Sequence, residues 1–269
     1  MVTTETSIGE PVALTIAGFD PSGGAGIIAD IRTFVHFGCR PVAAITSLTF
    51  QNSAGVFGAI HETASSLRAQ ILPITEEQRV AAVKIGMLPT AELVFEVARL
   101  IRENKLPAPV IDPVIQSSSG YELMDPEAMQ VLLSELMPLA RLLTPNIPEA
   151  EKLTELKITN EDEACAAANR LREMGARAVL VKGGHLGQRS EIRGQGSGEI
   201  PQQAIDVLDD EGQLTILRGE WIESLPVRGT GCMLSSAIAA CLAQGISLEE
   251  SVRLAREFVA DALLQSRER

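Results

Sequence analysis

Near the C-terminus, a glycine loop leads into an apolar helical pattern, an arrangement that suits the binding of an anion. Gly229, Thr230 and Gly231 precede Cys232 and an alanine-rich stretch. Backbone N–H groups at a helix N-terminus bind phosphate-like anions or a developing oxyanion. The same position lowers the pKa of a thiol, which favours a basic or nucleophilic role for Cys232 over that of a small apolar residue. An ordinary N-terminal turn would also explain the glycines, and the chain contains no Walker A sequence.

A second glycine loop, residues 18–29 (GFDPSGGAGIIA), follows an apolar segment and opens another helical pattern. The letters GAGIIA satisfy the dinucleotide fingerprint, but no Asp or Glu lies between residues 31 and 61 to bind a ribose. This absence argues against a dehydrogenase. Asp30 falls in the first helical turns, where its carboxylate could face the same cleft as the loop. A buried carboxylate there needs a hydrogen-bonding partner, or it titrates.

Polar residues also follow three apolar segments further along the chain. Asp112 ends PVID, Asn146 and Glu149 follow LLTP, and Lys182 ends VLVK. Two carboxylates and an amide at the ends of parallel strands could hold a hydrated Mg²⁺, which prefers few carboxylates plus substrate phosphates. A turn before proline would equally explain Asp112, and a helix cap would explain Asn146. A phosphate contact explains Lys182 better than packing does.

The hydrophobic pattern predicts the elements that position these residues. Apolar β-branched segments alternate with helical patterns, which is typical of βαβ units around a largely parallel sheet. The strands are expected at 13–17, 42–49, 81–86, 109–114, 141–145 and 178–184. The helices are expected at 25–37, 65–72, 75–80, 90–104, 126–136, 148–156 and 160–174, the last ending before Gly175.

The pattern changes near the C-terminus. Two alternating runs around residues 210–212 (DEG) predict an antiparallel hairpin. The helix that follows the second glycine loop is expected to stop before Gly245. Ser247 and Glu250 form a capping-box sequence for a final helix at 248–265.

Composition limits the class of protein. With 23 basic and 35 acidic side chains, the net charge of −12 argues against nucleic-acid binding. Apolar runs fall short of the roughly 18 residues of a membrane span, and the N-terminus has no secretory signal pattern. Four cysteines without a CxxC pair argue against zinc and, with the missing signal, predict a soluble cytoplasmic protein without disulfides. Without a linker or repeat, we expect a tail at 1–12 and one domain at 13–266.

The chain as a whole resembles a known family. In order, it contains LTIAGFDPSGGAGIIADIRTF, ITSLTFQNSAGV, KIGML, VIDPV, LLTPNIPEAEKL, VLVKGGH and GTGCMLSSAIAA. These segments, between about residues 13 and 243, resemble the motifs of the hydroxymethylpyrimidine/phosphomethylpyrimidine kinases of thiamin biosynthesis. The resemblance implies a ribokinase-like α/β fold, a central mostly parallel sheet between two helical layers. It also implies ATP and Mg²⁺ as cofactors, a small pyrimidine alcohol or its monophosphate as substrate, and a homodimer.

The resemblance also implies roles for residues on the substrate side. Gly18, Asp30 and Gln51 match pyrimidine-contacting positions of the family, and Met87 matches the position that packs on the ring. A glutamine amide offers a donor and an acceptor together, which suits an aminopyrimidine edge.

On the phosphate side, Asn146 and Lys182 match nucleotide-phosphate contacts, and Asp112 and Glu149 match the acids near Mg²⁺. The glycine loop 229–232 matches the anion hole that stabilises the transferred group. Its last residue, the cysteine, matches the position of the base for the acceptor hydroxyl, or it only positions that hydroxyl.

The chain departs from the family pattern at several positions. Arg228 stands where the family usually has His, and it either clamps a phosphate or points outward. The segment 118–120 (SSG) lacks the lysine of many flap sequences, and Phe50 is bulkier than the usual small residue. Two alternative functions stay open: a pyridoxal kinase of the same fold, and a non-catalytic sensor that binds pyrimidine or ATP.

Overall fold

The computed structural model describes residues 9–103, 105–184, 203–222 and 228–267. In this part of the chain, nine strands form one sheet in the order β3-β2-β1-β4-β5-β6-β7-β8-β9. The strands are β1 (Val12–Phe19), β2 (Arg40–Asn52), β3 (Gly55–His61), β4 (Val80–Ile85), β5 (Val110–Ile111), β6 (Leu142–Leu143), β7 (Ala178–Lys182), β8 (Gln203–Asp210) and β9 (Gln213–Glu220).

The centre of the sheet is parallel. β1 pairs in parallel with β2 and β4, and β4 continues through β5, β6 and β7. At the margins, β3 pairs antiparallel with β2, and β8 pairs antiparallel with β7 and β9. The six predicted strands and the predicted hairpin are therefore confirmed, and β3 is an additional strand. Because the central strands are parallel, their carboxyl ends meet along one edge of the sheet.

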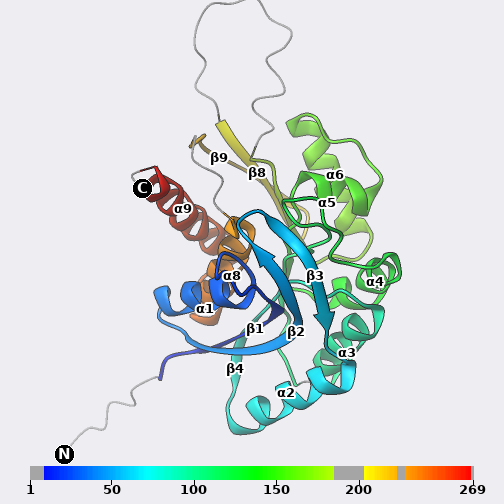
Figure 1. Cartoon of the computed structure of the whole chain (residues 1–269). Helices are drawn as coiled ribbons and strands as arrows, with labels where there is room; N and C mark the ends of the chain where they lie inside the picture. Colours follow the sequence, from blue (N-terminus) through cyan, green and yellow to red (C-terminus); the bar gives the residue numbers. More distant parts are fainter. Residues whose placement is uncertain (1–8, 104, 185–202, 223–227, 268–269) are drawn as a thin grey trace, which may run out of the picture.

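Helices cover both faces of the sheet, which confirms the expected three-layer α/β/α arrangement (Figure 1). One layer holds α2 (Ala64–Glu77), α3 (Ala91–Arg102), α4 (Pro126–Val131), the turns η1 (Leu132–Leu136) and η2 (Met137–Leu139), α5 (Ile147–Thr154) and α6 (Glu161–Glu173). The other layer holds α1 (Gly26–His36), α8 (Thr230–Ala243) and α9 (Leu248–Ser266).

Helix boundaries follow local capping chemistry, with two differences from the sequence prediction. The side chain of Ser247 accepts the Glu250 N–H at the start of α9, as predicted. The two short helices predicted at 65–72 and 75–80 form one helix, α2, which continues through Pro73. The helix predicted at 126–136 is α-helical only as far as Val131 and then continues as the π-helical turn η1.

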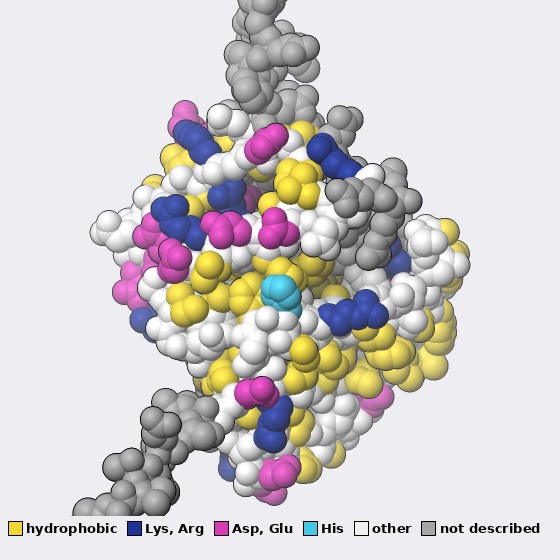
Figure 2. Space-filling model, turned by 90° about the vertical axis from the view of Figure 1, so that its left-hand side faces the viewer, with side chains coloured by type: hydrophobic (Ala, Val, Ile, Leu, Met, Phe, Trp, Pro, Cys, Tyr) yellow, Lys and Arg dark blue, Asp and Glu magenta, His cyan; other side chains and the backbone are white. Residues whose placement is uncertain are grey.

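One face of the surface and the lengths of the helices can be described directly. On the side that carries α1 and α9, acidic and basic side chains are interspersed around a band of hydrophobic ones, and no basic patch gathers there (Figure 2). No helix among the described residues is long and apolar enough to cross a membrane.

Candidate active site

The two glycine loops of the sequence meet backbone to backbone. Gly229 is the N-cap of α8, with φ of 76°, and a Cβ there would overlap the carbonyl oxygen of Gly24. Gly26, with φ of 57°, begins α1, and a Cβ there would overlap the carbonyl oxygen of Gly18. Only glycine fits positions that combine a positive φ with such a close approach. The N-terminus of α8 therefore opens directly beside the loop that joins β1 to α1.

Cys232 lies in the first turn of α8, and its thiol is not activated by that position alone. Burial raises the pKa of the thiol to about 11, against the charge of Lys84 and a hydrogen bond from the Gly26 N–H, which lower it. The residue keeps some exposure at the surface. The sequence prediction of a lowered thiol pKa is therefore wrong, because desolvation outweighs the helix terminus.

A buried ion pair lies beneath Cys232. The ammonium of Lys84, from β4, lies 2.9 Å from each carboxylate oxygen of Asp30, from α1, and neither side chain is exposed. Thr15 donates to Asp30 Oδ2 at 2.6 Å, and Ser236 donates to Oδ1 at 2.7 Å. Burial lowers the pKa of Lys84, but the charge of Asp30 and further acids outweigh it, so the lysine stays charged.

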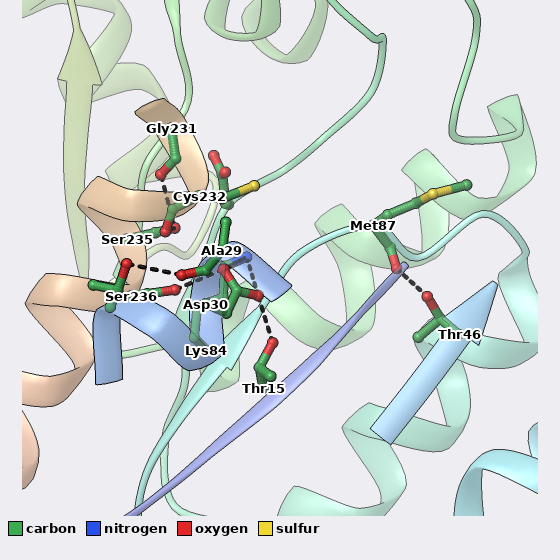
Figure 3. A network of polar contacts seen from close by, with 12 residues as sticks. Thr15, Ala29, Asp30, Thr46, Lys84, Met87, Gly231, Cys232, Ser235 and Ser236 are labelled. Atoms are coloured by element: carbon green, nitrogen blue, oxygen red, sulfur yellow. Dashed lines mark hydrogen bonds and ion pairs between the residues drawn. The ribbon is translucent and has the colours of Figure 1, made fainter. Parts of the chain in front are cut away.

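This network changes the position assigned to Asp30. Its carboxylate lies between Thr15, Lys84 and Ser236 and accepts hydrogen bonds from all three (Figure 3). Through these bonds the side chain joins β1, β4, α1 and α8 beneath the site, and its contact with a ring stays a prediction.

The phosphate side of the site centres on a second ion pair. Lys182 ends β7, and its Nζ lies 2.7 Å from Oδ1 of Asp112, which follows β5. A Cβ on Gly231 would lie 3.2 Å from Lys182 Nζ and 3.4 Å from Asp112 Oδ2. The pair therefore lies directly against the first turn of α8. Burial lowers the pKa of Lys182, but Asp112 and Glu149 outweigh it, so the pKa is raised.

Asn146 and Glu149 form a capping box at the start of α5. Asn146 Oδ1 accepts the Glu149 N–H at 2.9 Å, and Glu149 Oε2 accepts the Asn146 N–H at 2.8 Å. The structural reading of Asn146 as a helix cap is thus confirmed. Burial raises the pKa of Glu149 to about 7, with Asp112 adding to the increase and Lys182 opposing it.

The acids here suit a metal that takes few protein ligands. Among the described residues, no group of three or more His, Cys, Asp or Glu side chains could hold a metal ion. Asp112 and Glu149 are close enough to influence each other's charge, and both are buried. One or two carboxylates, with the other ligands from phosphates and water, is the coordination that Mg²⁺ prefers. The residues therefore fit Mg²⁺ better than a fully caged ion.

The substrate side lies at the ends of β1 and β2. A Cβ on Gly18 would lie 3.0 Å from the sulfur of Met87, so Met87 packs over the end of β1. Gln51 lies near the end of β2, and its Oε1 accepts a hydrogen bond from Arg228 at 2.8 Å. Arg228 thus points into this part of the protein, and the predicted alternative of an outward side chain is wrong.

Sequence reasoning did not find Lys84. Lys84 stands inside an apolar strand at the start of the KIGML segment, and the local sequence pattern gives its charge no role. The available signal was Asp30, since a buried carboxylate at the start of a helix requires donors or a cation nearby. The residues that were predicted lie at the strand ends or near the start of α1, α5 or α8.

The chain is similar in sequence to known proteins. A sequence model of the family described as phosphomethylpyrimidine kinase matches residues 20–268. The hydroxymethylpyrimidine/phosphomethylpyrimidine kinase of Aquifex aeolicus (strain VF5) is 37% identical and covers 95% of each chain.

Solved structures give the same result. The crystal structure of phosphomethylpyrimidine kinase from Clostridium difficile 630 has a TM-score of 0.77 at 36% identity, over 94% of this chain and 99% of that one. An ADP complex of Bacillus subtilis pyridoxal kinase has a TM-score of 0.78 at 35% identity, over 93% and 90%. The expected ribokinase-like fold is thereby confirmed. The family model and the Aquifex aeolicus kinase each match more than nine-tenths of this chain, so the chain belongs to the phosphomethylpyrimidine kinase family.

Proposed function

We propose that this protein is an ATP-dependent kinase that phosphorylates 4-amino-5-hydroxymethyl-2-methylpyrimidine and its monophosphate in thiamin biosynthesis. One observation carries the proposal: the first turn of α8 lies between the Lys182–Asp112 pair and the β1–α1 loop. A phosphate held at Lys182 and a ring held near Gly18 would therefore meet at Cys232. Family membership supports the same reaction.

Transfer at this site would depend mainly on positioning and on charge stabilisation. The N–H groups at the start of α8 stabilise negative charge on the transferred phosphoryl group. Lys182 binds the nucleotide phosphates, and Asn146 lies beside it in the sheet. Asp112 and Glu149 would hold Mg²⁺, which neutralises charge that develops between the phosphates.

Cys232 is better suited to positioning the acceptor hydroxyl than to removing its proton. With a pKa of about 11, the thiol is neutral near pH 7 and can hydrogen-bond a hydroxyl group. Phosphoryl transfer has a loose transition state in which the nucleophile forms little bond, so a strong base contributes little. The charge of Lys84 opposes the effect of burial and favours the thiolate, so the role of Cys232 as a base is tested alongside its role in positioning the hydroxyl.

A direct assay tests the proposal. The purified protein is incubated with MgATP and the pyrimidine alcohol, its monophosphate or pyridoxal, and phosphorylated products are quantified by mass spectrometry. We expect kcat/KM for both pyrimidines to exceed that for pyridoxal. Equal or faster turnover of pyridoxal would instead support the pyridoxal kinase alternative, which the B. subtilis neighbour represents. ATP binding without any product would support the sensor.

We infer that the protein acts as a homodimer through β2 and the edge strand β3. Large apolar side chains on these strands are exposed: Leu48, Phe50, Phe57 and Ile60, with Phe57 at 67%. An exposed apolar edge strand favours pairing with a second copy. Sedimentation equilibrium should give twice the chain mass of 28.7 kDa, and Phe57→Ser should shift the protein towards monomer. The control Phe95→Ser, at an exposed position on α3, should leave the mass unchanged.

We also infer one kinase domain at 13–266 after a tail at 1–12, working in the cytoplasm. All four cysteines are free, which suits a reducing compartment. Limited proteolysis that left a stable product beginning near residue 13 would support the domain boundary, and a stable internal fragment would contradict it.

A further inference from the structure

Arg228, immediately before the α8 loop, joins three segments at the substrate side of the site. Its Nη2 donates to Gln51 Oε1 at 2.8 Å, and its Nη1 donates to the Asn52 carbonyl oxygen and to Ser22 Oγ, the latter at 3.4 Å. The guanidinium therefore contacts both the end of β2 and the β1–α1 loop.

A buried acid holds the guanidinium in this place. Asp20 is only 1% exposed, and its Oδ1 accepts from the Ser22 N–H and hydroxyl at 2.8 and 2.7 Å. Asp20 Oδ2 is buried, has no hydrogen-bond partner among the residues that the structure describes, and lies 3.6 Å from Arg228 Nη2. A buried carboxylate oxygen needs a compensating charge, and Arg228 supplies it.

The contact with Gln51 fixes the orientation of the glutamine amide. An amide can rotate by 180° and exchange its oxygen for its NH₂ group, at little cost when nothing nearby distinguishes them. Arginine has only donors, so it can bond Gln51 Oε1 but not Nε2. Arg228 therefore holds Oε1 towards itself and leaves the two Nε2 protons directed away from the guanidinium.

We propose that Arg228 is a positioning residue for substrate selection, acting through Gln51. It fixes the amide so that Nε2 donates to the ring, and the site thereby selects a ring that presents a hydrogen-bond acceptor, such as an unprotonated ring nitrogen, to that group. This inference rests on the proposed function and on the contact of Gln51 with the pyrimidine that the family resemblance implies. It differs from the alternative that Arg228 clamps a substrate phosphate.

A double-mutant cycle separates these alternatives. We expect Arg228→Met to raise KM for the pyrimidine alcohol about tenfold, since a fixed hydrogen bond is lost, while kcat and KM for ATP change less than threefold. If Arg228 acts through Gln51, Arg228→Met should raise KM for the pyrimidine alcohol less than twofold when Gln51→Ala is already present. The same factor is expected for the alcohol and for its monophosphate. Arg228→Lys, which keeps the charge and donors, should recover part of the loss.

The matched control is Arg32→Met. Arg32 donates to the Gly23 carbonyl oxygen at 3.1 Å, so it also bonds the β1–α1 loop, whereas in the described part of the chain the side chain of Gln51 is hydrogen-bonded by Arg228 and not by Arg32. This variant should leave KM for the pyrimidine within twofold. Thermal unfolding of every variant identifies any that fail to fold, and ring binding measured by calorimetry replaces kinetics for a variant with low activity.

Three results would overturn the inference. One is an undiminished effect of Arg228→Met in the Gln51→Ala background, and another is a much larger effect on the monophosphate, which indicates a phosphate clamp. The third is an equal effect of Arg32→Met. If the wild-type protein turned over pyridoxal and no pyrimidine, the proposed function would fail by itself, and the same cycle with pyridoxal would then decide whether Arg228 acts through Gln51.

Discussion

The close contact between the two glycine loops gives the sharpest prediction for the site. In Gly229→Ala, the new residue must adopt a φ of 76°, which costs an L-residue about 1–2 kcal/mol. Its Cβ would also overlap the Gly24 carbonyl oxygen and lie 3.1 Å from Ala25 Cα. Neither neighbour is a flexible side-chain end, so the loops themselves must move apart.

The size of this movement sets the expected loss of activity. Relief of the overlap requires the loops to separate by roughly 1 Å, given normal contact distances between heavy atoms. The N–H groups at the start of α8 move with the loop, and misplacing catalytic groups by this distance costs about 100-fold in rate. Overpacking adds about 1–3 kcal/mol to the conformational strain, so we expect Gly229→Ala to lose about 2–5 kcal/mol of unfolding free energy.

Gly245→Ala separates the two causes. Gly245 follows α8 with φ of 80°, but a Cβ there would have no heavy atom within 4 Å. This variant carries the strain without the overlap, so it should lose about 1–2 kcal/mol and keep kcat within twofold. Urea unfolding gives the free energies, and steady-state turnover of the pyrimidine is measured well below each Tm. If Gly229→Ala matched Gly245→Ala in both measurements, the close approach would have no role in catalysis.

Three further perturbations test the electrostatics. The pKa of Glu149 is raised from 4.5 to about 7, so its contribution to stability is full below pH 4.5 and is lost as pH rises through 7. Glu149→Gln can still cap α5 but does not titrate. Between pH 4.5 and pH 8, its unfolding free energy should therefore rise relative to that of the wild type by up to about 3 kcal/mol. Urea unfolding curves of the two proteins that changed in parallel with pH would contradict this. Cys232→Ser should keep kcat within about tenfold of the wild-type value, whereas Cys232→Ala should lower kcat about 100-fold. Full activity of Cys232→Ala with unchanged KM would exclude both roles of the thiol, as the base and as the group that positions the acceptor hydroxyl. Lys84→Met should cost about 3–5 kcal/mol of unfolding free energy by leaving Asp30 uncompensated, and adding Asp30→Asn should restore part of it, whereas additive losses would mean that the pair is not coupled.

The fold was predictable where the hydrophobic pattern dominates. The central strands are buried between two helical layers, so their sequences are mostly apolar and stand out. β3 escaped prediction because GVFGAIH contains two glycines and is half-exposed at the edge of the sheet. The predicted break in α2 did not occur, because Leu67 and Ile71 bury one face of the helix and outweigh the hydrogen bond that Pro73 removes.

The site was predictable where position along the sheet decides it, and less so where long-range contacts do. Asp112 follows β5 and Lys182 ends β7, and only β6 separates these parallel strands, so both side chains lie at the same edge of the sheet. The raised pKa of Cys232 depends on burial by the whole fold, which no local spacing reveals. The contact of Arg228 with Gln51 joins residues 177 positions apart, and the type of neither residue predicts that the other lies beside it.

The protein has an overall charge of −12, and at this site too the positive side chains are balanced by carboxylates. Three cations each face a carboxylate: Lys84 faces Asp30, Lys182 faces Asp112 and Arg228 faces Asp20. Their charges nearly cancel, and the remaining acid, Glu149, has a pKa of about 7 because burial is not fully compensated by Lys182. The net side-chain charge around an anionic substrate is therefore small, so its binding depends on the N–H groups of α8 and on a divalent cation as well as on Lys182. A cation bound at Asp112 and Glu149 would favour ionised Glu149 and at the same time attract the phosphates, so metal and nucleotide binding should reinforce each other.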